Sequence, residues 1–408
     1  MHAIHLKVVY LFVALTMTAW NAGTAENTPP GSAARLRVTG TGELLLDGKP
    51  FRGFGVNYFD AFSRRLHNPE DHSSREGFAA LARYNIPFVR FMCGGFYASE
   101  WRYCLNNREA CFAALDEVVD SAHKNGVGLI PSLFWWYPGV PDLVGEPMDQ
   151  LGNPDSNTHA FIREYTEDVV RRYGNHPAIW AWEFGNEYNL ASDLPNAMDH
   201  LPPVIPGKGT PGKRTARDTV TTAMVMEAMR TFADTVRRLD PYRPVTTGHA
   251  LPRPSQYHQR IEGSWTIDTV EEYQRELLRA HPAPYDLVSV HIYPNRKARY
   301  FDMETCSWEK HMSILKEAAR TAGKAVFIGE FGSGNLEKEE GVETARKEFE
   351  SLLAAIEISG IALAALWVYD FSWQDDSCNV TPSNQRAWQL EALREVNARM
   401  KVSGTCPP

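Results

Sequence analysis

The most constraining feature of this sequence is the repeated alternation of short apolar runs with longer amphipathic segments. Eight runs have the length and the β-branched or aromatic content of buried strands, and a helical pattern follows each. The predicted strands are residues 52–59, 88–93, 128–135, 179–184, 244–249, 286–293, 325–331 and 362–369. The predicted helices are residues 74–84, 109–125, 158–173, 217–239, 267–280, 308–322, 342–358 and 384–400.

This alternation predicts a parallel sheet of the α/β class, because a strand, a helix and a second strand form a right-handed crossover. Eight units close a (β/α)8 TIM barrel, and the roughly 320 residues that they span suit a barrel with insertions. A doubly wound open sheet is the alternative, since that fold tolerates many strand numbers. Residues 36–50 show Gly turns between alternating strands, so we expect an N-terminal β-hairpin that covers the bottom of the barrel.

Two connections are longer than a simple turn requires. Residues 188–216, after the fourth strand, are rich in Pro, Gly and Asp, and residues 250–266, after the fifth, are rich in Pro, Gln and His. Both would lie at the top of the barrel, where barrel enzymes keep their active sites. We expect these long loops to wall a binding cleft, and insertions without a function are the alternative.

The N-terminus predicts export. Lys7 gives a basic start, an apolar stretch follows, and small residues lead to an expected cleavage site. The apolar stretch is short for a membrane span, and an uncleaved membrane anchor is the alternative. We therefore divide the chain into a signal peptide at 1–25, a polar lead-in at 26–35 and a single domain at 36–408. The mature protein is expected to be secreted (extracellular or periplasmic), monomeric and without a membrane span.

Export permits disulfides, and six cysteines allow 15 complete pairings. They lie at positions 93, 104, 111, 306, 378 and 406. Proximity favours only the pair Cys104–Cys111, and without a C-x-x-C pair a structural zinc site is not expected. The chain has 42 basic and 50 acidic side chains, a net charge of −8, and no basic run. This balance argues against nucleic acid as the main partner.

Two glutamates stand where predicted strands end. The fourth strand runs into Trp182-Glu-Phe-Gly-Asn-Glu187, and the seventh into Ile328-Gly-Glu330-Phe-Gly332. Strands four and seven face one another across a barrel, so both carboxyl groups can enter one pocket. Hydrolysis of a glycosidic bond needs one protonated and one ionised carboxyl, with separated pKa values. We therefore predict Glu187 and Glu330 as a catalytic pair.

Strand geometry sets a condition on this pair. Neighbouring residues on a regular strand point to opposite faces, so Asn186 and Glu187 cannot both face the pocket within one. A bulge or the end of the strand must turn one of them. Gly185 makes such a local distortion easy.

The segments 182–187 and 328–332 resemble the acid/base and nucleophile strands of glycoside hydrolase family 5, in clan A. Members are retaining (β/α)8 enzymes such as cellulases and β-mannanases. The resemblance covers roughly residues 36–400 in order, although only short segments are specific. It implies that Glu187 is the acid/base and Glu330 the nucleophile, and that the reaction needs no metal or organic cofactor.

The resemblance implies roles for five further residues. Arg90 matches an arginine that orients the nucleophile, and Asn186 matches an asparagine that bonds the 2-hydroxyl group of the sugar. His291 and Tyr293 match a pair near the reacting sugar, and Trp367 matches a platform on which sugars stack. Four more residues near strand ends either line substrate subsites or only pack: Asn57, Trp135, Trp136 and His249.

We therefore expect a retaining enzyme that cleaves a β-linked polysaccharide or oligosaccharide of the mannan or glucan type by double displacement. Many family members carry a His at the end of strand three, where this chain has Trp135-Trp136, and this favours a mannanase over a cellulase. An exo-acting β-glycosidase or a transglycosylase of the same clan is the first alternative. A carbohydrate-binding barrel without catalysis is the second.

Overall fold

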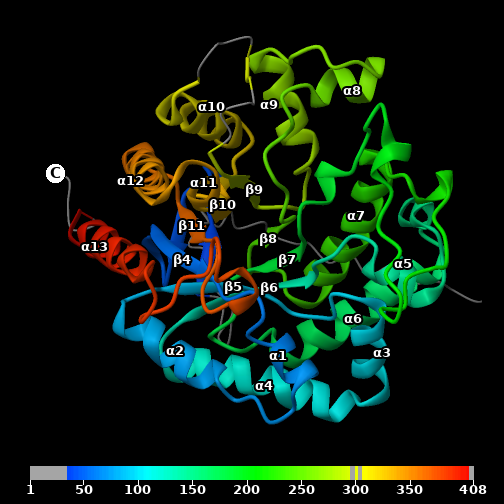
Figure 1. Ribbon diagram of the computed structural model, residues 1–408, viewed down its shortest axis with the longest axis horizontal. Coiled ribbons are helices and arrows are strands. Elements are labelled where there is room, and N and C mark those ends of the chain that lie inside the picture. Colours follow the sequence, from blue (N-terminus) through cyan, green and yellow to red (C-terminus); the bar gives the residue numbers. More distant parts are fainter. Residues whose placement is uncertain (1–34, 295–298, 302–305, 404–408) are drawn as a thin grey trace, which may run out of the picture. The chain divides into compact units, whose positions relative to one another are not determined.

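The computed structural model describes residues 35–294, 299–301 and 306–403. The predicted signal peptide and all but the last residue of the polar lead-in lie outside the described residues. Strands gather in the middle of the fold and helices surround them (Figure 1). Within the described ranges, no helix combines the length and the apolar character that a membrane crossing requires.

The central strands form one parallel sheet in the order β8-β7-β6-β5-β4-β11-β10-β9. This order follows the chain once around, and the end strands meet where the Asp286 amide donates to the Val245 carbonyl at 3.1 Å. The sheet is a nearly closed (β/α)8 barrel, so the doubly wound alternative is wrong. All eight predicted strands are confirmed: β4 (Gly53–Asn57), β5 (Phe88–Met92), β6 (Gly128–Phe134), β7 (Trp182–Gly185), β8 (Val245–Thr246), β9 (Leu287–Ile292), β10 (Ala325–Phe331) and β11 (Leu363–Leu366).

All eight predicted helices are present as well. The start of the fourth moves from residue 217 to Thr222, because the Thr221 hydroxyl caps the helix by accepting from the Met224 amide. The bounds are α2 (Ser74–Arg83), α4 (Arg108–Lys124), α6 (Asn157–Tyr173), α7 (Thr222–Leu239), α9 (Val270–Arg279), α10 (Trp308–Thr321), α12 (Val342–Ser359) and α13 (Ala387–Ser403).

Further short helices lie in the connections, and the sequence analysis missed them. Most are too short to show a clear 3.6-residue period. They are α1 (Ser63–His67), α3 (Ala98–Asn106), α5 (Gly139–Val144), α8 (Gln256–Glu262) and α11 (Leu336–Glu340), with 3-10 helices η1 (Met148–Gly152), η2 (Tyr188–Leu190), η3 (Ala197–His200), η4 (Ala216–Asp218) and η5 (Ser372–Gln374).

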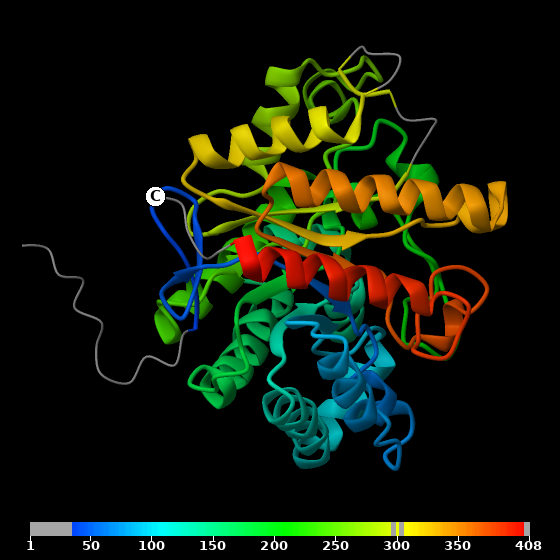
Figure 2. The same cartoon turned by 90° about the vertical axis from the view of Figure 1, so that its left-hand side faces the viewer.

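The predicted hairpin is confirmed as β1 (Leu36–Val38) and β2 (Leu44–Leu46), which pair antiparallel, with a short third strand β3 (Lys49–Pro50). This small sheet lies at one end of the barrel (Figure 2). Leu36 and Leu44 are buried against Phe88 and Phe327 at the start of the barrel strands. The hairpin therefore covers the bottom of the barrel, opposite the strand ends that carry the predicted site.

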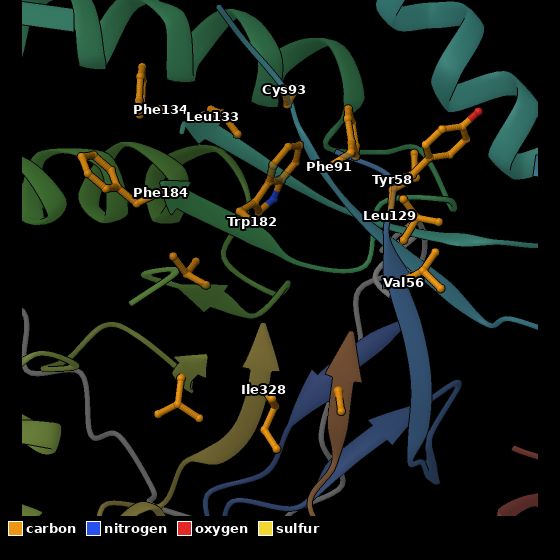
Figure 3. Close-up of a cluster of buried hydrophobic side chains, with 14 of the residues drawn as sticks. Val56, Tyr58, Phe91, Cys93, Leu129, Leu133, Phe134, Trp182, Phe184 and Ile328 are labelled. Atoms are coloured by element: carbon orange, nitrogen blue, oxygen red, sulfur yellow. The ribbon is translucent and has the colours of Figure 1, made fainter. Parts of the chain in front are cut away.

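Alternation along β7 decides which side chains reach the barrel axis. Trp182 and Phe184 belong to the main hydrophobic core, drawn in part in Figure 3. The Trp182 indole nitrogen donates to Asp240 at 2.9 Å, next to α7. Since neighbouring strand residues face opposite sides, Glu183 points to the interior of the barrel.

The predicted disulfide Cys104–Cys111 is present and joins α3 to α4. Because it closes a loop with a sequence separation of only 7, the chain-entropy model gives a stabilisation of about 2–3 kcal/mol. Replacing both cysteines with serine should lower the free energy of unfolding by this amount in urea titrations. Reductant should then have no further effect on the variant, and equal stability of the wild-type protein with and without reductant would contradict the prediction.

Candidate active site

The two predicted carboxyl groups meet at the carboxyl end of the barrel. Glu330 lies in β10, and Glu187 follows two residues after the end of β7. Glu187, His291 and Glu330 each place one side-chain atom within 4.8 Å of the other two. Retaining glycosidases hold their carboxyl groups about 5–5.5 Å apart, and inverting enzymes about 6.5–9.5 Å. The spacing here suits the direct attack of a retaining enzyme and is shorter than the gap that an inverting enzyme keeps for its attacking water.

Glu187 turns into the pocket because β7 ends at Gly185. Its φ of 54° lies in the left-handed region, which costs a residue with a side chain about 1–3 kcal/mol. The Glu187 amide donates to the Gly248 carbonyl at 2.8 Å and the Asn186 amide to the Trp135 carbonyl at 3.1 Å. These bonds hold the chain in a turn after the strand, where neighbouring residues no longer point to opposite faces. Asn186 and Glu187 therefore both border the pocket.

Arg90 is the centre of the charged network. Its side chain rises from β5 and is fully buried. One guanidinium nitrogen, Nε, donates to Glu183 at 2.8 Å. A second donates at 2.9 Å to both Asn57 and Glu330, and the third donates to Asn186 at 2.7 Å. One cation thus connects both strands that carry the predicted catalytic pair.

Two donors fix the orientation of the Glu330 carboxylate. Arg90 donates to Oε1, and the Tyr293 hydroxyl donates to Oε2 at 2.7 Å. Burial and the neighbouring carboxylate raise the pKa of Tyr293 well above its ordinary value, so the hydroxyl keeps its proton. An oriented carboxylate at this place is suited to nucleophilic attack.

Glu187 lies in different surroundings. Among the described residues, its side-chain hydrogen bond joins Oε1 to His291 Nδ1 at 2.9 Å. Burial raises the pKa of Glu187, opposed by the Arg90 charge. Burial also lowers the pKa of His291 to about 3, which leaves the imidazole neutral. A carboxyl with a raised pKa beside a neutral imidazole is suited to keep and deliver a proton.

One charged residue of this network, Glu183, was not predicted from the sequence. Glu183 is fully buried, and burial raises its pKa while Arg90 opposes the shift. The signal was available, because a glutamate between Trp182 and Phe184 interrupts an otherwise apolar buried strand. A carboxylate at such a position needs a buried cation, and Arg90 provides it.

A cavity of about 330 Å³ opens beside Glu187. Its lining includes Phe96, Trp135, Trp136, Asn186 and Leu190, from the loops after β5, β6 and β7. Trp136 stacks on Phe96 with ring centroids 5.3 Å apart and planes 9° apart. The predicted long loop after the fourth strand therefore does wall a pocket, whereas the loop after the fifth strand supplies none of the residues that line this cavity.

Trp367 lies just after β11 and is half-buried. Its ring stacks on Trp135, with centroids 6.0 Å apart and planes 28° apart, and its indole nitrogen donates to Gln374 at 2.8 Å. The Arg90 guanidinium lies over the Trp135 ring, with its central carbon 4.3 Å from the ring centroid. The two tryptophans thus form an aromatic wall next to the charged network.

Asn57 and His249 are buried and do not line the cavity beside Glu187. Asn57 is fully buried and donates to the Gly329 carbonyl at 2.9 Å, which ties β4 to β10. His249 is 2% exposed, and burial lowers its pKa well below the ordinary value. Of the two roles left open by the sequence, these positions favour packing over a subsite wall.

Glu187, His291 and Glu330 have the composition of a site for a divalent metal ion, two carboxylates and one imidazole. The local charge argues against that use. The Arg90 guanidinium already lies 2.9 Å from Glu330 Oε1, and a second cation there would be repelled. The arrangement is better suited to proton transfer and nucleophilic attack.

Replacing Arg90 with methionine should destabilise the fold strongly. The variant leaves the fully buried Glu183 without its cation, a change that costs about 3–5 kcal/mol. Urea unfolding measures the loss. As a matched control, Arg320→Met removes a pair with Glu317 in which both side chains are mostly exposed, and it should cost less than about 1 kcal/mol. Similar losses for the two variants would contradict the central role of Arg90.

The chain is similar in sequence to known mannosidases. The chain is 25% identical over 320 residues to mannan endo-1,4-beta-mannosidase A of Podospora anserina, across 74% of each chain. It is 25% identical over 351 residues to the putative mannan endo-1,4-beta-mannosidase 9 of Oryza sativa subsp. japonica, across 80% of this chain and 77% of the relative.

Solved structures share the fold. The endo-1,4-beta-mannanase from Rhizomucor miehei superposes with a TM-score of 0.62 at 15% identity, covering 90% of this chain and all of the other. The endo-beta-1,4-mannanase from Thermotoga petrophila gives a TM-score of 0.59 at 15% identity, covering 89% of this chain and 79% of the other. The family model "Cellulase (glycosyl hydrolase family 5)" matches residues 45–371. The chain is therefore a glycoside hydrolase and belongs to glycosyl hydrolase family 5.

Proposed function

We propose that this protein hydrolyses β-linked mannan-type polysaccharides or oligosaccharides with retention of configuration. One observation carries the proposal: oxygens of Glu187 and Glu330 lie within 4.8 Å of each other, in surroundings that differ. Glu330 is held by a cation and a hydroxyl, whereas burial raises the pKa of Glu187. Double displacement requires two carboxyl groups at this spacing, one oriented for attack and the other able to hold a proton.

In the first step, Glu330 attacks the anomeric carbon and the glycosidic bond to the leaving oxygen breaks. The proton of Glu187 passes to that oxygen, so an alcohol leaves and a covalent glycosyl-enzyme remains. Arg90 and Tyr293 hold the attacking carboxylate in place. Asn186, whose amide oxygen is anchored by Arg90 at 2.7 Å, can offer its amide group to the sugar.

In the second step, the ionised Glu187 takes a proton from water. The water oxygen bonds to the anomeric carbon, and Glu330 leaves with its electron pair. Two inversions give net retention. His291 remains neutral through both steps, because burial holds its pKa at about 3, and it keeps contact with Glu187 in either protonation state.

The sugar is proposed from the relatives, whose names describe mannan endo-1,4-beta-mannosidases. The aromatic wall of Trp135 and Trp367, together with Trp136 in the cavity lining, supports a sugar substrate of either the mannan or the glucan type. A panel of mannan, carboxymethyl-cellulose, xylan and β-1,3-glucan tests the class. We expect mannan to be hydrolysed fastest and the first product to be the β-anomer by NMR, whereas an α-anomer or a preference for xylan would refute the proposal.

We also propose that the enzyme acts outside the cytoplasm as a monomer. The disulfide Cys104–Cys111 supports an oxidising compartment. N-terminal sequencing of the exported protein should find a start close after residue 25, and light scattering should give the mass of one chain. Internal cleavage, exo-acting hydrolysis and transglycosylation give different products from mannohexaose. Chromatography of the digests distinguishes the three.

A further inference from the structure

The turn that carries Glu187 is held by a residue outside the pocket. This turn comprises η2 and residues up to Ser192. A short helix offers few backbone donors to its last carbonyl groups, and within the turn only the Ser192 amide, at 3.3 Å, is described as donating to the Asn189 carbonyl besides the cap amide. Arg253, in the loop after β8, supplies further donors. One guanidinium nitrogen donates to Asn189 at 2.6 Å and Leu190 at 3.0 Å, and another donates to Ser192 at 2.5 Å.

Besides these carbonyls, the Arg253 guanidinium contacts α8. No carboxylate forms an ion pair with it among the described residues, and its Nε donates to Gln259 of α8 at 2.6 Å. Its side chain is absent from the lining of the cavity beside Glu187. A guanidinium fork that spans three carbonyls fixes a backbone more strictly than a point charge can. Its position at the negative end of a short helix adds a favourable electrostatic contact.

The same loop anchors the turn at two further points. The Asn189 side chain exchanges two hydrogen bonds with the Ala250 backbone, each 3.0 Å long. The Gly248 carbonyl accepts from the Glu187 amide at 2.8 Å. Glu187 has a positive φ of 54°, and a residue in that region stays there only when its surroundings determine it. The loop after β8 therefore sets the conformation of Glu187 without touching its carboxyl group.

We propose that Arg253 is a positioning residue for the acid/base Glu187, acting through the carbonyls of Asn189, Leu190 and Ser192. The proposal rests on the proposed function of Glu187. It assigns to the long loop after the fifth strand a task other than lining the cavity. The geometry of proton delivery then depends on a side chain that contacts neither the substrate nor the catalytic pair.

The test compares leaving groups. A displaced acid fails mainly with substrates whose leaving oxygen needs a proton, so Arg253→Met should lower kcat/KM for phenyl β-mannobioside on the order of 10²-fold. The loss for 2,4-dinitrophenyl β-mannobioside, which leaves without a proton, should be far smaller. Arg253→Lys keeps the charge but not the fork, and it should show an intermediate loss with the same selectivity.

Arg260→Met is the matched control, because Arg260 is a neighbouring half-buried arginine that pairs with Glu276 of α9 and makes no described contact with the turn. It should change thermal stability without changing the ratio of the two rates. Equal losses on both substrates in Arg253→Met, or in Arg253→Lys if the first variant does not fold, would overturn the inference. If Glu187→Gln is also without leaving-group selectivity, the proposed function itself fails; if Glu187→Gln is selective and the Arg253 variants are not, only the positioning role fails.

Discussion

Glu330→Gln should lower kcat by roughly 10⁵–10⁶-fold, since removing a covalent nucleophile from a catalytic unit costs about this much. The amide has nearly the same shape as the carboxylate, so substrate can still enter the site. It cannot form the bond to the anomeric carbon on which the first step depends. Single-turnover assays with 2,4-dinitrophenyl β-mannobioside measure the loss directly, because a good leaving group removes any need for acid assistance.

This variant should remain folded. Arg90 keeps its buried partner Glu183, so the guanidinium is not left without a carboxylate. Glu317→Gln, which changes an exposed glutamate on α10, is the matched control and should leave both activity and thermal stability unchanged. A Glu330→Gln protein that is folded and retains more than about one hundredth of wild-type activity would show that another group attacks the sugar.

Glu187→Gln should lower kcat/KM for phenyl β-mannobioside by about 10²–10⁴-fold, the usual contribution of a placed acid. For the dinitrophenyl substrate, kcat/KM should stay near the wild-type value, because it reports the first step and this leaving group needs no proton. The second step lacks its base, so the glycosyl-enzyme should accumulate. Stopped-flow measurement should therefore record a burst of dinitrophenolate equal to the enzyme concentration.

The comparison of leaving groups tests Glu187 as the acid of the first step, and the burst tests it as the base of the second. An equal loss on both substrates would mean that Glu187 acts on something other than the leaving group. A fast first step without a burst would mean that Glu187 is not the base of the second step. Glu183→Gln provides a contrast four residues earlier in the chain, because its carboxyl is fully buried and contacts Arg90 rather than the pocket. Its loss should be independent of the leaving group.

The barrel could be predicted from the sequence because its strands are short, apolar and separated by regular helices. The place of Glu187 and Glu330 followed from the same pattern, since both stand at strand ends. Local alternation also anticipated that a bulge or the end of the strand must turn Asn186 or Glu187, and that Gly185 would ease this distortion; β7 in fact ends at Gly185. These features depend on near neighbours along the chain.

Other features depend on contacts between distant segments. Nothing local to Arg253 indicates that it donates to three carbonyls some sixty residues earlier. Asn57 was placed at a strand end correctly, but only the closed barrel shows that its buried amide donates to the Gly329 carbonyl. Glu183 is the exception, because its burial between two aromatic residues of β7 was visible in the sequence and was missed.

The most direct measurement is the trapping of the covalent intermediate. A 2-deoxy-2-fluoro β-mannosyl fluoride slows both steps and retains a good leaving group, so the glycosyl-enzyme should accumulate in the wild-type protein. Peptide mapping by mass spectrometry should find one sugar on the peptide that contains Glu330, and none in the Glu330→Gln variant. A label on Glu187, on Glu183 or on any other residue would contradict the assignment of the nucleophile.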